Sequence, residues 1–223
     1  MSRVAVTSIL AAGAVFAACA PALAGQPLVP VSLTAATAKA DWEALSSLAR
    51  SGDARAQRRA ALMLLDGTAP AACAAAGCHE EASAYLKDAA LRGDMIALVT
   101  LERLRRAGAP SAPSQAEIVA IETERAEDGD LVAAWRLAQR YQDGDGVERS
   151  SGEAVRWLTK VATAENSSYP KTTEAAYRLC EAYGRGEGVK ADDAKAQRWC
   201  QRAAHAGHAG AALVLAQLKR LDG

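Results

Sequence analysis

Two segments of the chain repeat the same pattern of residues at a fixed spacing. The first contains Leu137, Tyr141, Gly144, Gly146, Val147 and Trp157. The second contains Leu179, Tyr183, Gly186, Gly188, Val189 and Trp199, and every residue follows its counterpart at the same offset along the chain. A period of about 40 residues is typical of helical solenoids, in which each repeat is one pair of helices. The spacing therefore predicts an all-α protein built as an α-solenoid of antiparallel helix pairs.

Each repeat carries the signals of two helices joined by a turn. Leu137, Ala138 and Tyr141 lie on one face of a first helix. Gly144 and Gly146 end this helix, because glycine reaches positive φ without a Cβ clash. The second helix has an apolar stripe made of Ala154, Trp157, Leu158, Val161 and Ala162. Neither helix buries its apolar side alone, so neighbouring pairs must stack on each other.

The repeated pattern resembles a known family. Leu-x-x-x-Tyr-x-x-Gly-x-Gly-Val, followed by Ala-x-x-Trp on the next helix, is similar to the Sel1-like repeats, which are relatives of the tetratricopeptide repeats. The resemblance is strong over residues 129–206, weaker over 52–128 and absent before about residue 40. It implies about four repeats and a role in binding other proteins.

Glycine–aspartate steps beginning at Gly52, Gly93 and Gly129 place the repeats along the chain, because each step ends one helix and caps the next. Four helix pairs are predicted, at 53–66 with 79–92, 94–107 with 114–128, 130–143 with 151–165, and 172–184 with 191–206. Helices at 37–51 and 209–221 are expected to act as caps. The second pair departs most from the pattern, since Arg105 replaces the tyrosine and Ala109–Pro113 replaces the glycine turn.

The N-terminal residues have the form of an export signal. Residues 1–24 contain Arg3, a short apolar run and a small-residue site for cleavage after Ala24, which indicates a signal peptide and a periplasmic or secreted protein. Residues 25–36 are expected to form an extended leader before a repeat domain at 37–223. The segment ending in Cys19 also resembles a lipobox, so a lipoprotein anchored at Cys19 is the alternative and the only predicted membrane contact.

Export makes the remaining cysteines candidates for disulfides, because the compartment is oxidising. Cys73, Cys78, Cys180 and Cys200 allow three ways of pairing. Cys180 and Cys200 lie on the two helices of one predicted hairpin, and Cys73 and Cys78 lie in one loop. Sequence locality therefore favours Cys180–Cys200 and Cys73–Cys78, in keeping with the cysteine-rich Sel1-like proteins that this part resembles.

Three short motifs are candidates for cofactor, metal or catalytic sites. Cys73 to His79 resembles a variant haem-attachment motif, but its spacing differs from the usual Cys-x-x-Cys-His. His205 and His208 have no further ligand nearby in sequence. The segment 168–171, Ser-Tyr-Pro-Lys, matches the Ser-x-x-Lys of penicillin-recognising enzymes without their other elements. No cofactor, metal or catalytic residue is therefore predicted, and the zero net charge argues against nucleic acid.

The first helix of each pair is expected to line the concave surface of the solenoid. Positions two residues before and after the repeated leucine then face a groove, and the residues predicted to bind a partner there are Trp135, Tyr177, Arg103, Gln139 and Glu181. Aromatic residues flanked by polar ones are typical of protein-binding hot spots. Trp135 and Tyr177 equally suit a second role, filling gaps between repeats.

These patterns together predict an exported, non-enzymatic scaffold that binds a protein or peptide in the groove of the solenoid. The alternative is an exported hydrolase of β-lactams or cell-wall fragments, of the cysteine-rich Sel1-like type. The identity of the partner is not encoded in any motif of the chain.

Overall fold

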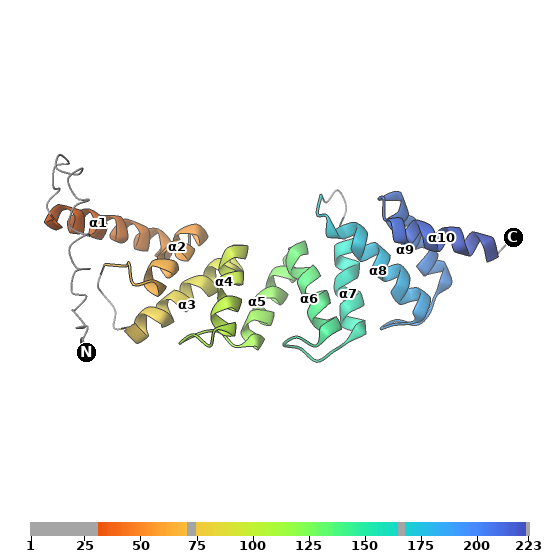
Figure 1. Cartoon of the computed structure of the whole chain (residues 1–223), viewed down its shortest axis with the longest axis horizontal. Helices are drawn as coiled ribbons and strands as arrows, with labels where there is room; N and C mark the ends of the chain where they lie inside the picture. The colour runs from red at the N-terminus through yellow and green to blue at the C-terminus, as the bar shows by residue number, and fades with distance from the viewer. Residues whose placement is uncertain (1–30, 71–74, 165–167, 222–223) are drawn as a thin grey trace, which may run out of the picture. The chain divides into compact units, whose positions relative to one another are not determined.

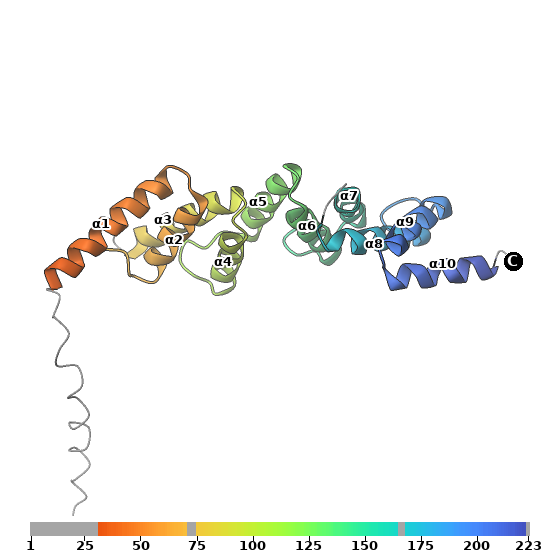
Figure 2. The same ribbon diagram turned by 90° about the horizontal axis from the view of Figure 1, so that it is seen from above.

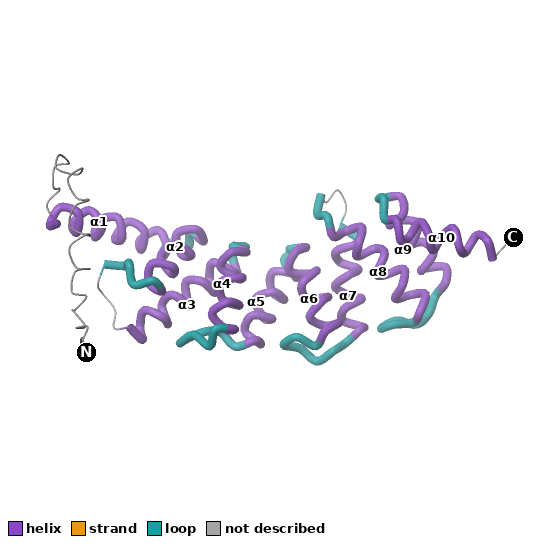
Figure 3. The backbone as a smooth tube through the Cα atoms, in the orientation of Figure 1, coloured by secondary structure: helices purple, strands orange, loops and turns teal. Residues whose placement is uncertain are grey.

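A computed structural model of the chain describes residues 31–70, 75–164 and 168–221. These residues form ten α-helices and no strand (Figure 3), so the predicted all-α fold is confirmed. The signal peptide predicted at residues 1–24 and Cys19 lie outside the described residues. No described helix combines the length and the apolar character that crossing a membrane requires.

The ten helices follow one another through short connections (Figure 1). In the first half they are α1 (Val31–Arg50), α2 (Ala54–Leu65), α3 (Ala75–Leu91), α4 (Met95–Arg106) and α5 (Gln115–Glu127). In the second half they are α6 (Leu131–Asp143), α7 (Ser151–Ala162), α8 (Lys171–Arg185), α9 (Asp193–His205) and α10 (Ala209–Leu221). Residues from Trp42 onward form one compact unit.

The first helix begins earlier than the sequence predicts. It starts at Val31 instead of residue 37, so the predicted extended leader at 25–36 overlaps its first turns. Pro30 is the last proline before the helix, and proline opposes a helix only where it interrupts the hydrogen-bond ladder. The segment after Pro30 contains no further proline or glycine before Gly52, which leaves nothing to delay the helix start.

Three of the four predicted helix pairs pack closely: α2 with α3, α6 with α7, and α8 with α9. The second predicted pair, α4 with α5, is different, because these two helices touch sparsely and α5 packs mainly on α6. Figure 2 shows α5 and α6 following each other in this way. The connection between α4 and α5 holds Pro110 and Pro113, and Ser111 has a φ of 57° there, so it does not form the tight glycine turn of the α6–α7 and α8–α9 pairs.

The glycine turns close the α6–α7 and α8–α9 pairs as predicted. Gly144 and Gly186 end α6 and α8 in the left-handed conformation, with φ of 77° and 72°. Gly188 also lies close to the preceding pair, because a Cβ added there would come within 2.3 Å of the Ser151 backbone. Glycine at this position therefore serves both the turn and the stacking of α8–α9 on α7.

A small apolar cluster of Ala49, Ala56 and Ala60 lies on α1 and α2, and two larger apolar clusters of the described residues meet at α5. The first lies among α2 to α5 and includes Leu64, Leu86, Leu98, Leu101 and Ile118. The second lies among α5 to α10 and includes Leu137, Trp157, Leu158, Leu179 and Cys200. Both clusters contain many buried alanines. The small alanine side chain lets neighbouring helices pack closely and also favours the helical conformation.

Charged residues, not apolar ones, occupy the space between α4, α5 and α6. We call this set the charged junction; it consists of Glu102, Glu122, Arg136 and Arg140. Glu122 is 0% exposed and Arg140 is 6% exposed. The Arg136 Nε lies 2.6 Å from Glu122 Oε1, and Arg140 pairs with both glutamates. Each buried charge thus has an opposite charge in contact, which burial requires.

The guanidinium groups of the charged junction favour the ionised form of Glu102. Burial is the largest influence on the pKa of Glu102 and raises it, but the guanidinium groups of Arg136 and Arg140 together lower the pKa below its ordinary value. When the buried positions of α5 and α7 are aligned, Glu122 takes the place of Leu158. The junction therefore replaces core residues of the repeat with ion pairs.

Candidate partner-binding site

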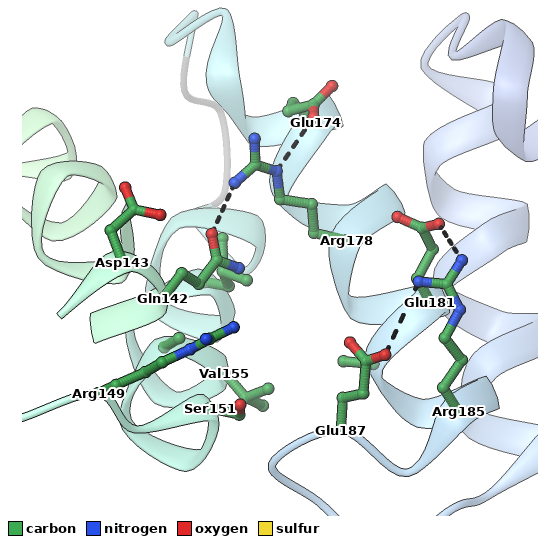
Figure 4. Close-up of a pocket in the computed structure, with 13 residues that line it drawn as sticks. Gln142, Asp143, Arg149, Ser151, Val155, Glu174, Arg178, Glu181, Arg185 and Glu187 are labelled. Carbon is green, nitrogen blue, oxygen red and sulfur yellow. Dashed lines mark hydrogen bonds and ion pairs between the residues drawn. The ribbon is translucent and has the colours of Figure 1, made fainter. Parts of the chain in front are cut away.

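A polar pocket lies where α6, α7 and α8 meet, at the boundary between two helix pairs (Figure 4). We call it the α6–α8 pocket; its volume is about 470 Å³. Its polar lining residues are Gln142, Asp143, Arg149, Ser151, Glu174, Arg178, Glu181, Arg185 and Glu187. Its apolar lining residues are Ala154, Val155, Leu158 and Ala182, which are buried.

Arg178 fixes one wall of this pocket. Its Nε donates to Glu174 Oε1 at 3.1 Å, and its Nη1 donates to the Gln142 side-chain oxygen at 2.9 Å (Figure 4). Its guanidinium carbon also lies 4.7 Å from the centroid of the Trp135 ring. The Lys171 ammonium lies 5.5 Å from the same centroid. Trp135 therefore lies beneath two cations, which are attracted to its ring face.

Glu174 links this wall to the last helix. Its second oxygen lies 3.3 Å from the His208 Nε2, and the His208 ring stacks on Tyr177 with 4.2 Å between ring centroids. Burial, the largest influence, raises the pKa of Glu174, but Arg178 and His208 lower it below its ordinary value. The backbone N–H of Ala211 donates to the other ring nitrogen of His208, so this histidine also caps α10.

Two charged residues of the pocket are open to a ligand. Arg185 already pairs with Glu181 at 3.0 Å and lies 3.9 Å from Glu187. Arg149 and Asp143, in contrast, are exposed and make no hydrogen bond or ion pair with any residue the structure describes. Figure 4 shows the Arg149 side chain extending between Gln142 and Ser151 into the pocket.

The structure does not gather the five predicted partner-binding residues in one place. Glu181 lines the α6–α8 pocket, whereas Gln139 lines a separate pocket of about 280 Å³ beside the charged junction. Arg103 is exposed on α4. Their part in binding a partner stays a prediction.

The two predicted aromatic residues are not an open pair on the surface. Trp135 is 7% exposed and belongs to the second apolar cluster. Tyr177 is half-buried and covered on one ring face by His208. Two cations from α8 lie over the Trp135 ring, and the His208 ring lies over Tyr177, so each ring is covered on one face by another side chain. The gap-filling role that the sequence also allowed describes Trp135 better.

Sequence reasoning did not identify Arg178, Arg149 or Gln142 as site residues. One signal was present, because Arg178 occupies the position in its repeat that Arg136, of the charged junction, occupies in the preceding one. Arg136 on α6 pairs with glutamates of α4 and α5, whereas Arg178 on α8 pairs with Glu174 of its own helix and donates to Gln142 of α6. Arg149 lies in the turn of its repeat and has no such marker.

The predicted disulfide between α8 and α9 is confirmed. Cys180 and Cys200 are bonded, with 5.1 Å between their Cα atoms, and both are buried. The bond fixes the two helices of the last pair to each other. Cys73 lies outside the described residues, so the Cys73–Cys78 pairing stays a prediction, as does the haem-attachment interpretation of this loop.

The other two motifs form no cluster in the described chain. His205 contacts the Gln201 carbonyl oxygen at 2.7 Å, whereas His208 faces Glu174. No group of three or more potential metal ligands occurs among the described residues. Ser168 lies before α8, which begins at Lys171 after Pro170, so it is not the helix-start serine that the penicillin-recognising motif places there.

Comparison with known families identifies the repeats. The Sel1 repeat family model matches residues 131–166 and 173–208. These segments contain α6 with α7 and α8 with α9, the two pairs that show the glycine turn. No curated protein matches the chain.

Solved structures with related folds were also found. A Sel1 repeat protein from Oxalobacter formigenes is 27% identical with a TM-score of 0.52, and the match covers 81% of this chain and 49% of that one. A protective antigen of uropathogenic Escherichia coli, described as having an SLR fold, is 25% identical with a TM-score of 0.49, covering 76% and 34%. Helicobacter pylori cysteine rich protein B is 16% identical with a TM-score of 0.42, covering 60% and 92%.

The chain thus spans about a third to a half of the first two of these proteins. The Oxalobacter structure shares the arrangement of stacked helix pairs, which agrees with the fold described above. The chain thus contains two segments that match the Sel1 repeat, and its fold is that of an α-solenoid of stacked helix pairs.

Proposed function

We propose that this protein is an exported, non-enzymatic scaffold that binds an extended segment of a protein partner at the α6–α8 pocket. The observation that carries the proposal is the pairing of open charges with an apolar lining. Arg149 and Asp143 are free to receive groups of opposite charge, and the buried side chains of Val155 and Leu158 form an apolar floor beneath them. A peptide supplies charged, polar and apolar groups together, as recognition of extended segments requires.

The repeat architecture supports the same function. Stacked helix pairs build extended surfaces that are suited to binding other proteins. Predicted residues keep a role in this proposal: Glu181 lines the α6–α8 pocket and orients Arg185. Trp135 acts from below, because its ring supports the Arg178 guanidinium that forms the pocket wall. Arg103, Gln139 and Tyr177 would extend the binding surface beyond the pocket.

The described residues of the pocket lack the groups that a hydrolase needs. Covalent hydrolysis requires a nucleophile within hydrogen-bond reach of a base. Ser151 lines the pocket, but no histidine does. The nearest described histidine, His208, already contacts Glu174, Tyr177 and the Ala211 amide. The geometry therefore favours binding over the hydrolase alternative.

Export is supported by the Cys180–Cys200 bond, because disulfides persist in oxidising compartments. It is also supported by the signal-peptide pattern of residues 1–24. Mass spectrometry of the mature N-terminus tests this part directly. A mature chain that begins at Gly25 would support soluble export. A mature chain that begins at a lipidated Cys19 would instead support a lipoprotein anchored to the membrane.

Site-specific photo-crosslinking in the native host tests the binding site. Benzoylphenylalanine in place of Glu187, an exposed residue that lines the pocket, should crosslink one protein, whereas the same group at Arg59, an exposed position on α2, should not. In an affinity capture of the same protein, Arg149→Glu should abolish recovery and Arg149→Lys should retain it, with circular dichroism unchanged. Equal crosslinking at both positions, or capture that ignores the Arg149 charge, would overturn the proposal. If the native protein hydrolyses a chromogenic β-lactam and Ser168→Ala does not, the hydrolase alternative would be favoured instead.

A further inference from the structure

A second pocket, on α8 and α9, is built only from cationic and aromatic side chains. We call it the α9 pocket; its volume is about 410 Å³ and its lining residues are Tyr183, Lys195, Arg198, Trp199 and Arg202. The Lys195 Nζ lies 5.2 Å from the centroid of Tyr183, and the Arg202 guanidinium carbon lies 5.8 Å from that of Trp199. None of the described lining residues carries a negative charge.

The preceding repeat has a similar set of side chains, but there acidic residues pair with the cations. We call this paired arrangement the closed form. The corresponding positions in that repeat are Tyr141, Glu153, Arg156, Trp157 and Lys160. There, the Arg156 guanidinium carbon lies 4.0 Å from the Trp157 centroid, and the Arg156 Nε donates to Glu153 at 2.8 Å. Trp157 is 1% exposed, whereas its counterpart Trp199 is only half-buried.

Glu127, at the end of α5, completes the closed form. Its two carboxylate oxygens lie 3.2 Å from Arg156 Nη1 and 3.3 Å from Lys160 Nζ. Lys160 also donates to the Glu127 backbone carbonyl at 3.0 Å. One acidic residue of the polypeptide thus bridges both cations through its side chain and its main chain.

The α9 pocket lacks both acidic groups of the closed form. Lys195 stands where the preceding repeat has Glu153, which reverses the charge. The buried residues of α5 and α7 align one for one, Ile121 with Trp157 and Ala126 with Ala162. This alignment puts Thr163 in the place of Glu127.

Among the described residues, Arg198 and Arg202 of the α9 pocket are therefore left without the acidic partners that Arg156 and Lys160 have. Thr163 is uncharged, and its hydroxyl already donates to the Thr159 carbonyl at 2.7 Å. Asp192 pairs with Lys195 at 3.6 Å. No carboxylate of the described chain lies within ion-pair distance of Arg198 or Arg202.

We propose that the α9 pocket binds an acidic segment of a protein partner, with one carboxylate bridging Arg198 and Arg202 as Glu127 bridges Arg156 and Lys160. The contact in the preceding repeat combines a carboxylate with a peptide carbonyl, which an acidic peptide supplies and a free phosphate does not. The faces of Tyr183 and Trp199 offer room for aliphatic groups of the same segment. This site is separate from the α6–α8 pocket and does not rest on its function.

Fluorescence anisotropy with a defined probe tests the proposal on the full chain. The probe is a fluorescein-labelled peptide, Gly-Glu-Glu-Leu-Glu-Glu-Gly, and its all-glutamine analogue is the negative probe. Arg198→Ala with Arg202→Ala should weaken binding of the acidic peptide by at least about tenfold, since two charge-assisted contacts are lost. Arg156→Ala with Lys160→Ala removes the same net charge from the closed repeat and should leave the affinity unchanged.

Two further variants rebuild the closed form inside the α9 pocket. Thr163→Glu supplies the missing bridging carboxylate, and Lys195→Glu restores the acidic residue of the preceding repeat. Each should weaken peptide binding, because an internal acid then competes with the peptide for the same cations. Circular dichroism shows whether each variant keeps its helices.

Several results would overturn the proposal. They are equal weakening by the two double variants, equal binding of the glutamine analogue, and full affinity of Thr163→Glu and Lys195→Glu. Tighter binding of heparin than of the peptide would assign the pocket to an anionic polysaccharide instead. Arg149→Glu should not change peptide binding, so a failure at the α6–α8 pocket is distinguishable from a failure here.

Discussion

The guanidinium carbon of Arg178 lies 4.7 Å from the centroid of the Trp135 ring, which joins a core residue of α6 to the wall of the α6–α8 pocket. Trp135 is therefore both a packing residue and a support for a surface cation. A substitution at either residue acts on the pocket, but only one of them removes core volume.

Trp135→Ala should lower the free energy of unfolding by about 3–5 kcal/mol, because it leaves a large cavity in the second apolar cluster. Arg178→Met keeps the ring covered and should cost only about 1 kcal/mol, the size of a partly exposed cation–π contact. Urea unfolding followed by circular dichroism measures both. Equal losses in the two variants would mean that the indole contributes no more through packing than through its contact with the cation.

Glu122→Ala should be among the most damaging single changes in the chain. It leaves Arg136 and Arg140 buried with less opposite charge, at a cost of about 3–5 kcal/mol. The matched control is Glu153→Ala, which removes an acid from an exposed pair with Arg156 and should cost less than about 1 kcal/mol. Chemical unfolding gives the free energy of unfolding of both variants. A similar loss of free energy in the two would contradict the importance of burial at the charged junction.

Stability should fall in acid partly through Glu102. Its folded-state pKa lies below the ordinary value, so its contribution is fully present above the unfolded pKa of about 4.3 and is lost as the pH drops through the lowered value. Glu102→Gln should therefore be less stable than the native protein at pH 7, and this gap should shrink below about pH 4. Unfolding free energies from pH 7 to pH 3 measure the gap. The control is Glu148→Gln, at an exposed position without a described ion pair, which should be about as stable as the native protein at pH 7.

Reduction of the Cys180–Cys200 bond should lower the free energy of unfolding by about 3 kcal/mol, from the chain entropy of a loop with a sequence separation of 20. The measurement is urea unfolding with and without dithiothreitol, in a Cys73→Ala/Cys78→Ala background that isolates this bond. Since the bond joins helices that pack closely anyway, the reduced protein should remain helical. A midpoint that ignores the reductant would show that the bond adds nothing to the packing.

Much of the fold follows from the repeat itself. The spacing of Leu137 and Leu179, the glycine turns and the Cys180–Cys200 hairpin all appear in the structure where the pattern puts them. These features are local, so a short window of sequence contains everything that determines them. The helix α1 begins earlier than predicted. The prolines before it disfavour a helix at their own positions, but they do not determine how soon a helix begins after them.

The charged junction and the pockets are harder to predict for a physical reason. Glu102, Glu122 and Arg140 are polar residues at positions that the repeat makes core, and only contacts from three different helices neutralise them. The sequence left open whether Trp135 faces a groove or fills a gap between repeats, because the cations that cover its ring come from another helix, α8. The replacement of Glu153 by Lys195, in contrast, is visible in the aligned repeats and marks the α9 pocket directly.

The charged junction has a consequence for how the molecule comes apart. Neighbouring repeats are usually coupled by buried apolar area. Here the first and second clusters are also joined by the ion pairs of the charged junction, whose strength depends on geometry and on ionisation. In a linear array, cooperativity extends only as far as nearest-neighbour coupling allows. In acid, the helix pairs before α5 and those after it should therefore lose their coupling first. The chain should then unfold in two separate steps, one for each cluster.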